Sequence, residues 1–176
     1  MKRIFGLLLV VLLMLPAVAM ANDVKIGYVD LQKALNLSEA GQAAKGKIAE
    51  KVKDYQGTIE SRQAELKNLK DELEKKELLL SEEARSEKER DYQQKLKDFQ
   101  RFTKDVQDEL QQKDADYTKS ILEEIFKVIQ EVSEKGGYTL VLEKTESSIL
   151  YAADQIDLTN AVIEAYDARH QKDEGN

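Results

Sequence analysis

The feature that most constrains this chain is a long and sparse repeat of apolar residues. Between residues 48 and 80 they recur at alternating intervals of four and three, although Arg62 and Lys76 fill two places in the series. The series consists of Ile48, Val52, Tyr55, Ile59, Leu66, Leu69, Leu73 and Leu80. Such spacing places one narrow apolar stripe on a helix and is typical of coiled coils. We therefore expect a helix that meets one partner along a seam and is hydrated elsewhere.

A second apolar series predicts the partner of this helix. The chain is expected to turn back within residues 75–83, where Ser81, followed by two glutamates, is a favourable helix start. The second stripe consists of Leu96, Phe99, Val106, Leu110 and Tyr117, with Thr103 and Lys113 as polar members. Together the two series predict an antiparallel coiled-coil arm over residues 37–120.

The returning helix becomes much more apolar beyond residue 120. Seven of the twelve residues from 121 to 132 are apolar, so this end must be covered on more than one side. Gly136 and Gly137 are expected to end the helix. We assign an oligomerisation base to Ile125, Phe126, Val128, Ile129, Val132, Leu140 and Leu142.

Short strands and helices are expected beside this apolar end. Alternating apolar residues predict strands at 24–29 and 138–142, and the apolar stretch at 149–152 predicts a third. Asp30 is expected to cap a short helix that ends near Leu35, and Asp157 to cap a last helix. The inward face of that last helix is predicted to carry Leu158, Ala161, Val162 and Ala165. A body this small is marginal alone, so we expect it to oligomerise.

These elements predict a mostly helical α+β chain with four parts. A leader occupies residues 1–21, the body residues 22–36 and 121–169, the arm residues 37–120, and a polar tail residues 170–176. The leader begins with Lys2 and Arg3, continues with an apolar run over residues 4–18 and ends in Ala19-Met20-Ala21. This order is typical of a secretory signal peptide that is cleaved near Ala21. The alternative is a membrane anchor, but the run falls short of the ~20 residues that span a bilayer. The sequence thus predicts secretion across the inner membrane into the periplasm.

Charge and composition exclude several classes of function. Two of the 27 basic residues and none of the 34 acidic residues lie in the leader, which leaves the mature chain at −9. An acidic chain is not expected to bind nucleic acid. The chain has no Cys, which excludes disulfides and thiol chemistry.

The motifs that suggest chemistry are all explained better by structure. Residues 41–48 nearly match a phosphate-binding loop, but Ile48 replaces the hydroxyl residue and the segment lies inside a helical pattern. His170 stands alone in a polar stretch without a nucleophile or a metal-ligand cluster around it. Asp154 and Asp157 flank a turn and suit capping better than a cation site. We expect no catalytic residue, metal or cofactor.

The far end of the arm carries candidate binding residues. Only one of the three consecutive residues Leu78, Leu79 and Leu80 can face the partner helix, so the others are expected to be exposed. They either close the hairpin's own turn or bind another chain through apolar contact. Tyr92 and Phe102 lie near the edge of the seam. The predicted client-binding set is Leu78, Leu79, Leu80, Tyr92, Phe99 and Phe102.

The order of these motifs resembles the OmpH-like (Skp) family of periplasmic chaperones. After the signal sequence come IGYVD at 26–30, Ala40-Gly41 at the foot of a charged hairpin, GYTLVL at 137–142, LYA at 150–152 and DLT at 157–159. The resemblance implies a jellyfish-shaped homotrimer with three arms around a cavity, which holds unfolded outer-membrane β-barrel proteins without ATP. Members of that family look basic whereas this chain is acidic, so contact with a membrane or lipopolysaccharide is left open.

Two functions from different classes remain at this stage. A holding chaperone needs a flexible arm with modest apolar surface spread along it, so that many sequences bind and none binds irreversibly. A structural coiled-coil scaffold of the cell envelope explains the hairpin equally well, but not the apolar end with its flanking strands. The resemblance favours the chaperone over the scaffold.

Overall fold

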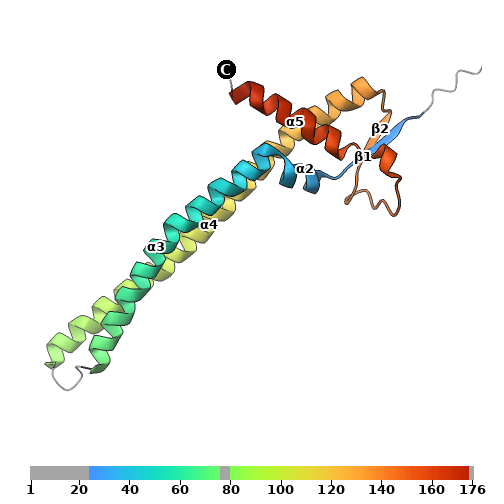
Figure 1. Ribbon diagram of the computed structural model, residues 1–176. Coiled ribbons are helices and arrows are strands. Elements are labelled where there is room, and N and C mark those ends of the chain that lie inside the picture. The colour runs from blue at the N-terminus through green and yellow to red at the C-terminus, as the bar shows by residue number, and fades with distance from the viewer. Residues whose placement is uncertain (1–23, 76–79, 175–176) are drawn as a thin grey trace, which may run out of the picture.

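The protein consists of a long helical arm and a small body at one end of it (Figure 1). The computed structural model describes residues 24–75 and 80–174. The predicted signal peptide, Lys76, Leu78 and Leu79 lie outside the described residues. The elements follow the order β1, α2, α3, α4, β2, η1 and α5.

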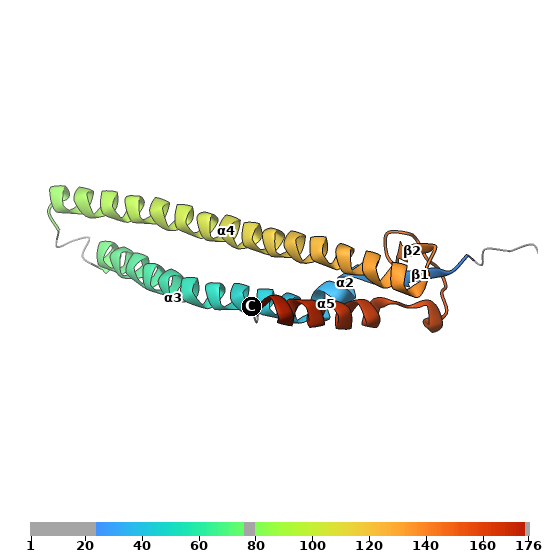
Figure 2. The same cartoon turned by 90° about the horizontal axis from the view of Figure 1, so that it is seen from above.

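The arm is formed by α3 (Glu39–Lys75) and α4 (Glu82–Gly136). The two helices lie side by side in both ribbon views, which confirms the predicted hairpin (Figure 2). The predicted seam is confirmed. Nearly all its described members are partly or fully buried, whereas the other residues of the arm are largely exposed. Val106 is the one member that is fully buried, and Val52 is the exception at 46% exposed. A narrow seam therefore holds the arm together.

The body assembles around the end of α4. Strands β1 (Ile26–Val29) and β2 (Leu140–Glu143) pair in parallel, with Ile26 opposite Leu140. The short helix α2 (Leu31–Leu37) and the last helix α5 (Thr159–Glu174) pack against α4. The buried core consists of Val29, Ala34, Ala40, Ile121, Ile125, Val128, Leu158, Val162 and Tyr166. The core thus draws on α2, α3, α4, α5 and β1 together.

The predicted helix ends are confirmed in their chemistry. The Asp30 carboxylate accepts the backbone N–H of Lys33 at 2.8 Å, and the Ser81 hydroxyl accepts that of Ala84 at 3.3 Å. Gly137 adopts a left-handed conformation (φ 67°) after α4. The N–H of Tyr138 then donates to the carbonyl of Ser133 at 2.9 Å, which satisfies one of the last carbonyls of the helix.

Two expectations for the body are wrong. Residues 149–152 form no strand: β2 ends at Glu143, a turn follows, and residues 154–156 make the short 3-10 helix η1 (Asp154–Ile156). The segment pairs with neither described strand: β1 lies between β2 and an isolated bridge from Tyr28 to Asp157, and the outer edge of β2 stays unpaired among the described residues. On α5, Ala161 is exposed, and the inward face is instead formed by Val162 and Tyr166.

Candidate functional site

The polar residue at the middle of the arm seam is accommodated by an aromatic ring. The Arg62 guanidinium lies 4.1 Å from the centroid of the Phe102 ring, a cation–π contact. Phe102 also meets Tyr55 edge to face, with ring centroids 6.2 Å apart. The Tyr55 hydroxyl donates to Glu109 Oε2 at 2.6 Å, and this hydrogen bond, with burial, raises the pKa of Tyr55. This part of the seam is held by mixed polar and aromatic contacts.

Ion pairs cross the seam nearer the tip. Lys95 meets Glu65 and Lys88 meets Glu72, each pair at 2.7 Å. The hydrogen bonds from these lysines to the glutamates raise the pKa values of both lysines. Exposed pairs of this kind add little stability and are screened by salt. The distal arm is therefore a wet contact between two charged helices.

The described members of the predicted client-binding set are all partly buried. Leu80, Tyr92, Phe99 and Phe102 each keep part of their side chain accessible, and none is fully exposed. Phe102 contacts Tyr55 and Arg62 within the arm. These residues thus form a row of half-covered apolar groups along the hairpin. Leu78 and Leu79 fall outside the described residues, so their part in the set stays a prediction.

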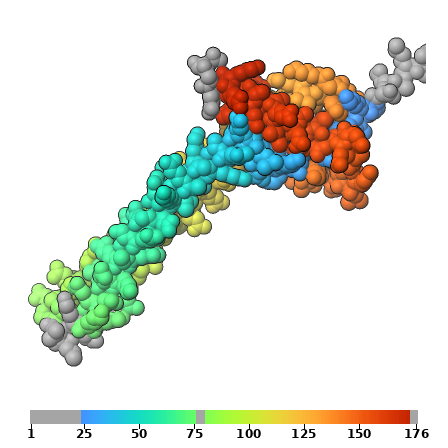
Figure 3. Space-filling view, viewed as in Figure 1, coloured from blue at the N-terminus to red at the C-terminus, as the bar shows by residue number. Residues whose placement is uncertain are grey.

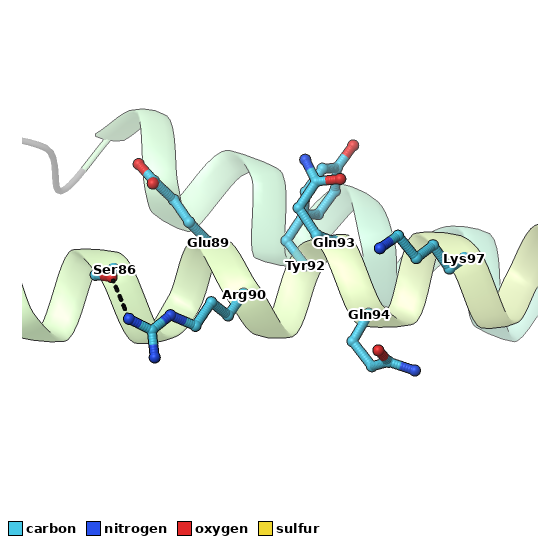
Figure 4. A pocket seen from close by; sticks show the side chains of 7 residues that line it. All are labelled: Ser86, Glu89, Arg90, Tyr92, Gln93, Gln94 and Lys97. Atoms are coloured by element: carbon cyan, nitrogen blue, oxygen red, sulfur yellow. Dashed lines mark hydrogen bonds between the residues drawn. The ribbon is translucent and has the colours of Figure 1, made fainter.

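A shallow hollow on the distal part of α4 does not form a ligand site. It is lined by Ser86, Glu89, Arg90, Tyr92, Gln93, Gln94 and Lys97, which all belong to one helix. Figure 4 shows these side chains spread around α4, with Arg90 hydrogen-bonded to Ser86. A hollow on the outside of a single helix encloses nothing. It does leave Tyr92 partly accessible beside polar side chains.

The predicted base residues divide into a buried and an exposed group. Ile125 and Val128 are fully buried in the core, and Ile129 and Val132 pack against it. Phe126 lies on α4 between them in sequence but is 55% exposed. Leu140 is also exposed, and Leu142 is half-buried. Only part of the predicted base therefore stabilises the single chain.

Besides Phe126, exposed apolar residues of the body lie on the strands and on the segment that follows β2. Ile26 and Leu140 are opposite one another in the β1–β2 pairing, and both are exposed. Leu150 is 100% exposed and Tyr151 87% exposed, in the segment predicted to be a strand. Several large apolar residues left this exposed are typical of a surface that another chain covers.

A polar network joins the strands to the start of α5, and sequence reasoning missed most of it. Asp157 accepts the N–H of Thr159 at 2.8 Å, and the Thr159 hydroxyl accepts the N–H of Asp30 at 3.0 Å. Burial by itself would raise the pKa of Asp157, but hydrogen bonds from Thr159 and Tyr28 outweigh it and lower the pKa. Burial and the Asp157 charge raise the pKa of Tyr28. The sequence signalled only that Asp157 precedes a helix.

The motifs that suggested chemistry lie in ordinary structural surroundings. The segment that resembles a phosphate-binding loop, residues 41–48, lies within α3, where its amides belong to the helix. Residues 24–75 and 80–174 contain no cluster of His, Asp and Glu that suits a metal ion. His170 stacks on Tyr166, with ring centroids 6.1 Å apart. Among the described helices, none has a stretch apolar and long enough to cross a bilayer.

The arrangement defines a class of protein with one coiled-coil hairpin on a small α/β base, and comparison with known proteins identifies its family. Residues 25–166 match the OmpH-like family of outer membrane proteins. The chain therefore belongs to the OmpH-like family, a family of chaperones.

A crystal structure and a sequence relative match most of the chain. An OmpH-like protein from Caulobacter crescentus, named as a candidate outer membrane chaperone, superposes with a TM-score of 0.76 and 20% identity over 83% of this chain and 85% of that one. That likeness supports the fold. An uncharacterised protein from Aquifex aeolicus is 27% identical over 167 residues, which cover 95% of this chain and 97% of its relative.

Proposed function

We propose that this protein is an ATP-independent holding chaperone of the periplasm, which binds unfolded outer-membrane β-barrel proteins along its arm and prevents their aggregation. The observation that carries the proposal is the wet, half-covered seam of the arm. The aromatic and leucine side chains along it are neither buried nor fully exposed. Contacts of this kind hold many sequences weakly, which suits a carrier that must later release its client.

We further propose that the body assembles as a homotrimer, as the family resemblance implies. Support comes from the apolar groups that one chain leaves uncovered, among them Phe126, Leu140, Leu150 and Tyr151. The outer edge of β2 carries no partner strand among the described residues. A second copy can cover such groups, and residues 149–152 can then take the strand role that a single chain does not give them. Light scattering on the mature protein should give three times the chain mass.

The direct test is suppression of aggregation. A β-barrel protein is diluted from urea with and without the mature chain, and turbidity is followed over time. We expect suppression at near-stoichiometric amounts, and the same suppression with ATP added, because residues 41–48 lie within helix α3 and do not form a phosphate-binding loop. Nucleotide-dependent release would revive the phosphate-loop interpretation of residues 41–48.

A shortened arm assigns the activity to a region. Deleting residues 66–99 and joining the ends by a short turn removes matched parts of α3 and α4, since Arg62 faces Phe102 just below the cut. None of the core residues of the body is touched. We expect the shortened protein to keep the same number of chains in its assembly and to lose its suppression of aggregation. Full activity of the shortened protein would show that clients bind the body.

The same pair of proteins separates the chaperone from a scaffold of the cell envelope. A scaffold uses its arm as a spacer, and neither the full-length nor the shortened form would then suppress aggregation. A chaperone loses that activity only with the arm. The half-covered apolar row on the arm favours the chaperone.

A further inference from the structure

The foot of the arm is attached to the body in two different ways. Helix α4 runs without a break from the arm into the body, whereas α3 begins only at Glu39, after a break in the helix at Ser38. The Ser38 hydroxyl caps the new helix by accepting the N–H of Gly41 at 3.2 Å. The direction in which α3 leaves the body is therefore not fixed by a continuous helix and must be fixed by contacts.

Helix α5 supplies several of these contacts from far along the chain. The backbone N–H of Glu39, the first residue of α3, donates to Asp167 Oδ1 at 2.9 Å. The side-chain amide of Gln171 donates to both carboxylate oxygens of Glu39, each at 2.9 Å. The first N–H groups of a helix have no partner within it, so an acid that accepts one stabilises the start of that helix. Figure 3 shows α5 lying against the first turns of α3.

The same stretch of α5 is tied to α4. Arg169 pairs with Glu131 at 2.8 Å, and the hydroxyl of the buried Tyr166 donates to Glu124 at 3.1 Å. The first half of α5 is anchored in the core by Leu158 and Val162. The second half thus extends from a fixed anchor and joins both arm helices where they meet the body.

We propose that residues 166–171 of α5 form a clasp that fixes the angle of the start of α3 against α4 and the body. Apart from Tyr166, its links to the arm are polar and exposed, so they open more easily than the buried core. With the clasp closed, α3 keeps one direction. With the clasp open, the first turns of α3 can shift about Ser38 relative to α4, while the seam still joins the two helices farther along the arm. The angle of α3 would then set the size of client that the arm holds, an inference that rests on the function proposed above.

The clasp is tested by removing the two side chains that hold Glu39. In Asp167→Ala/Gln171→Ala, α5 keeps its buried anchors and gains residues of high helix propensity. We expect amide exchange in residues 39–45 to rise by about tenfold or more, in line with loss of the charge-assisted hydrogen bond between the Glu39 amide and Asp167. Glu164→Ala is the matched control, since it removes one carboxylate from an exposed position of the same helix.

The arm angle is measured by spin labels, because the chain has no native Cys. Labels at Gln63→Cys on α3 and Lys127→Cys on α4 occupy exposed positions. Labelled chains are diluted into unlabelled ones, so that distances within one chain are read. The distance distribution should broaden in the double variant and stay narrow in the control. Unchanged exchange and unchanged distances would overturn the clasp.

Two additions keep this test independent of folding and of the proposed function. If the double variant does not fold, Gln171→Ala alone decides, because that side chain is exposed. It should give a smaller rise in exchange, and no rise would overturn the clasp. Neither measurement uses a client. A protein that fails to suppress aggregation but responds to the α5 variants refutes the chaperone and retains the clasp.

Discussion

The body and the distal arm differ in the kind of contact that stabilises them. In the body, Ile125 and Val128 on α4 are fully buried beneath α5 and the other helices. In the distal arm, the corresponding seam residues Leu66 and Leu69 are only half-covered, and an ion pair between Lys88 and Glu72 crosses the seam nearby. The body is stabilised by burial, and the arm by many weak contacts. Disruption of one seam contact should therefore cost less than disruption of the core.

This contrast is sharpest for a charge placed in each region. Val128→Asp buries a carboxylate without a partner and should cost more than about 3 kcal/mol, which unfolds the body or separates the assembly. Leu69→Asp at the half-buried seam should cost much less, because water reaches the new charge. Helicity, thermal melting and light scattering measure both. Lys127→Asp, at an exposed neighbouring position, is the control. Equal losses of stability in Val128→Asp and Leu69→Asp would show that the body and the arm are not stabilised differently.

Two glycines of α3 extend the comparison to the backbone. A Cβ on Gly41 would lie 1.7 Å from the carbonyl oxygen of Leu35, so the α2–α3 junction must shift. Gly41→Ala should cost about 2–3 kcal/mol. Nothing lies within 4 Å of a Cβ on Gly57, further along the arm. Gly57→Ala should stabilise the helix by up to about 1 kcal/mol. Opposite signs in thermal melting are expected, and a loss in both would mean that the arm is packed as tightly as its foot.

Acid should weaken the body through Asp157. Its pKa is lowered in the folded state, so the carboxylate stabilises the fold above its ordinary value of 3.8, and that stability is lost as the pH falls through the lower folded value. Asp157→Asn should flatten the loss of stability below pH 3.8, as measured by urea unfolding at several pH values. An unchanged pH profile in the variant would show that other carboxylates control acid unfolding.

The smallest effect is expected for salt on client binding. Residues 67–104 contain eleven basic and ten acidic residues, so the distal arm is nearly neutral. Salt shortens the screening length from about 30 Å at 0.01 M to about 10 Å at 0.1 M. Affinity for an unfolded acidic β-barrel client should change only a few-fold over that range in a binding titration. A hundredfold loss would show that basic residues of the arm act as one concentrated patch.

The sequence predicted the arm better than the body, for a physical reason. The seam of the arm depends on residues three and four apart, and the caps at Asp30, Ser81 and Gly137 depend on near neighbours. These interactions are local, so one stretch of sequence reveals them.

The missed features depend on residues far apart. Asp167 caps a helix that begins more than a hundred residues earlier, and the sequence around it carries no sign of that contact. Tyr166 lies in a polar stretch of the sequence, which suggests an exposed side chain. It is buried in the core because α5 packs against α4 there. The apolar segment at 149–152 has the composition of a strand, yet it pairs with neither of the two described strands.

The parallel pairing of β1 with β2 also has a consequence for the order of folding. The first contacts of this pair join Lys25 and Thr139, which are 114 positions apart. A parallel pair cannot form through a tight turn, and contacts between distant residues form slowly. The chain is made from its N-terminus, so β1 is synthesised long before β2. Helices α3 and α4 follow one another in the sequence, so they can pair before β2 is made. Strand β1 therefore stays unpaired until most of the chain has been made, and the body folds after the arm.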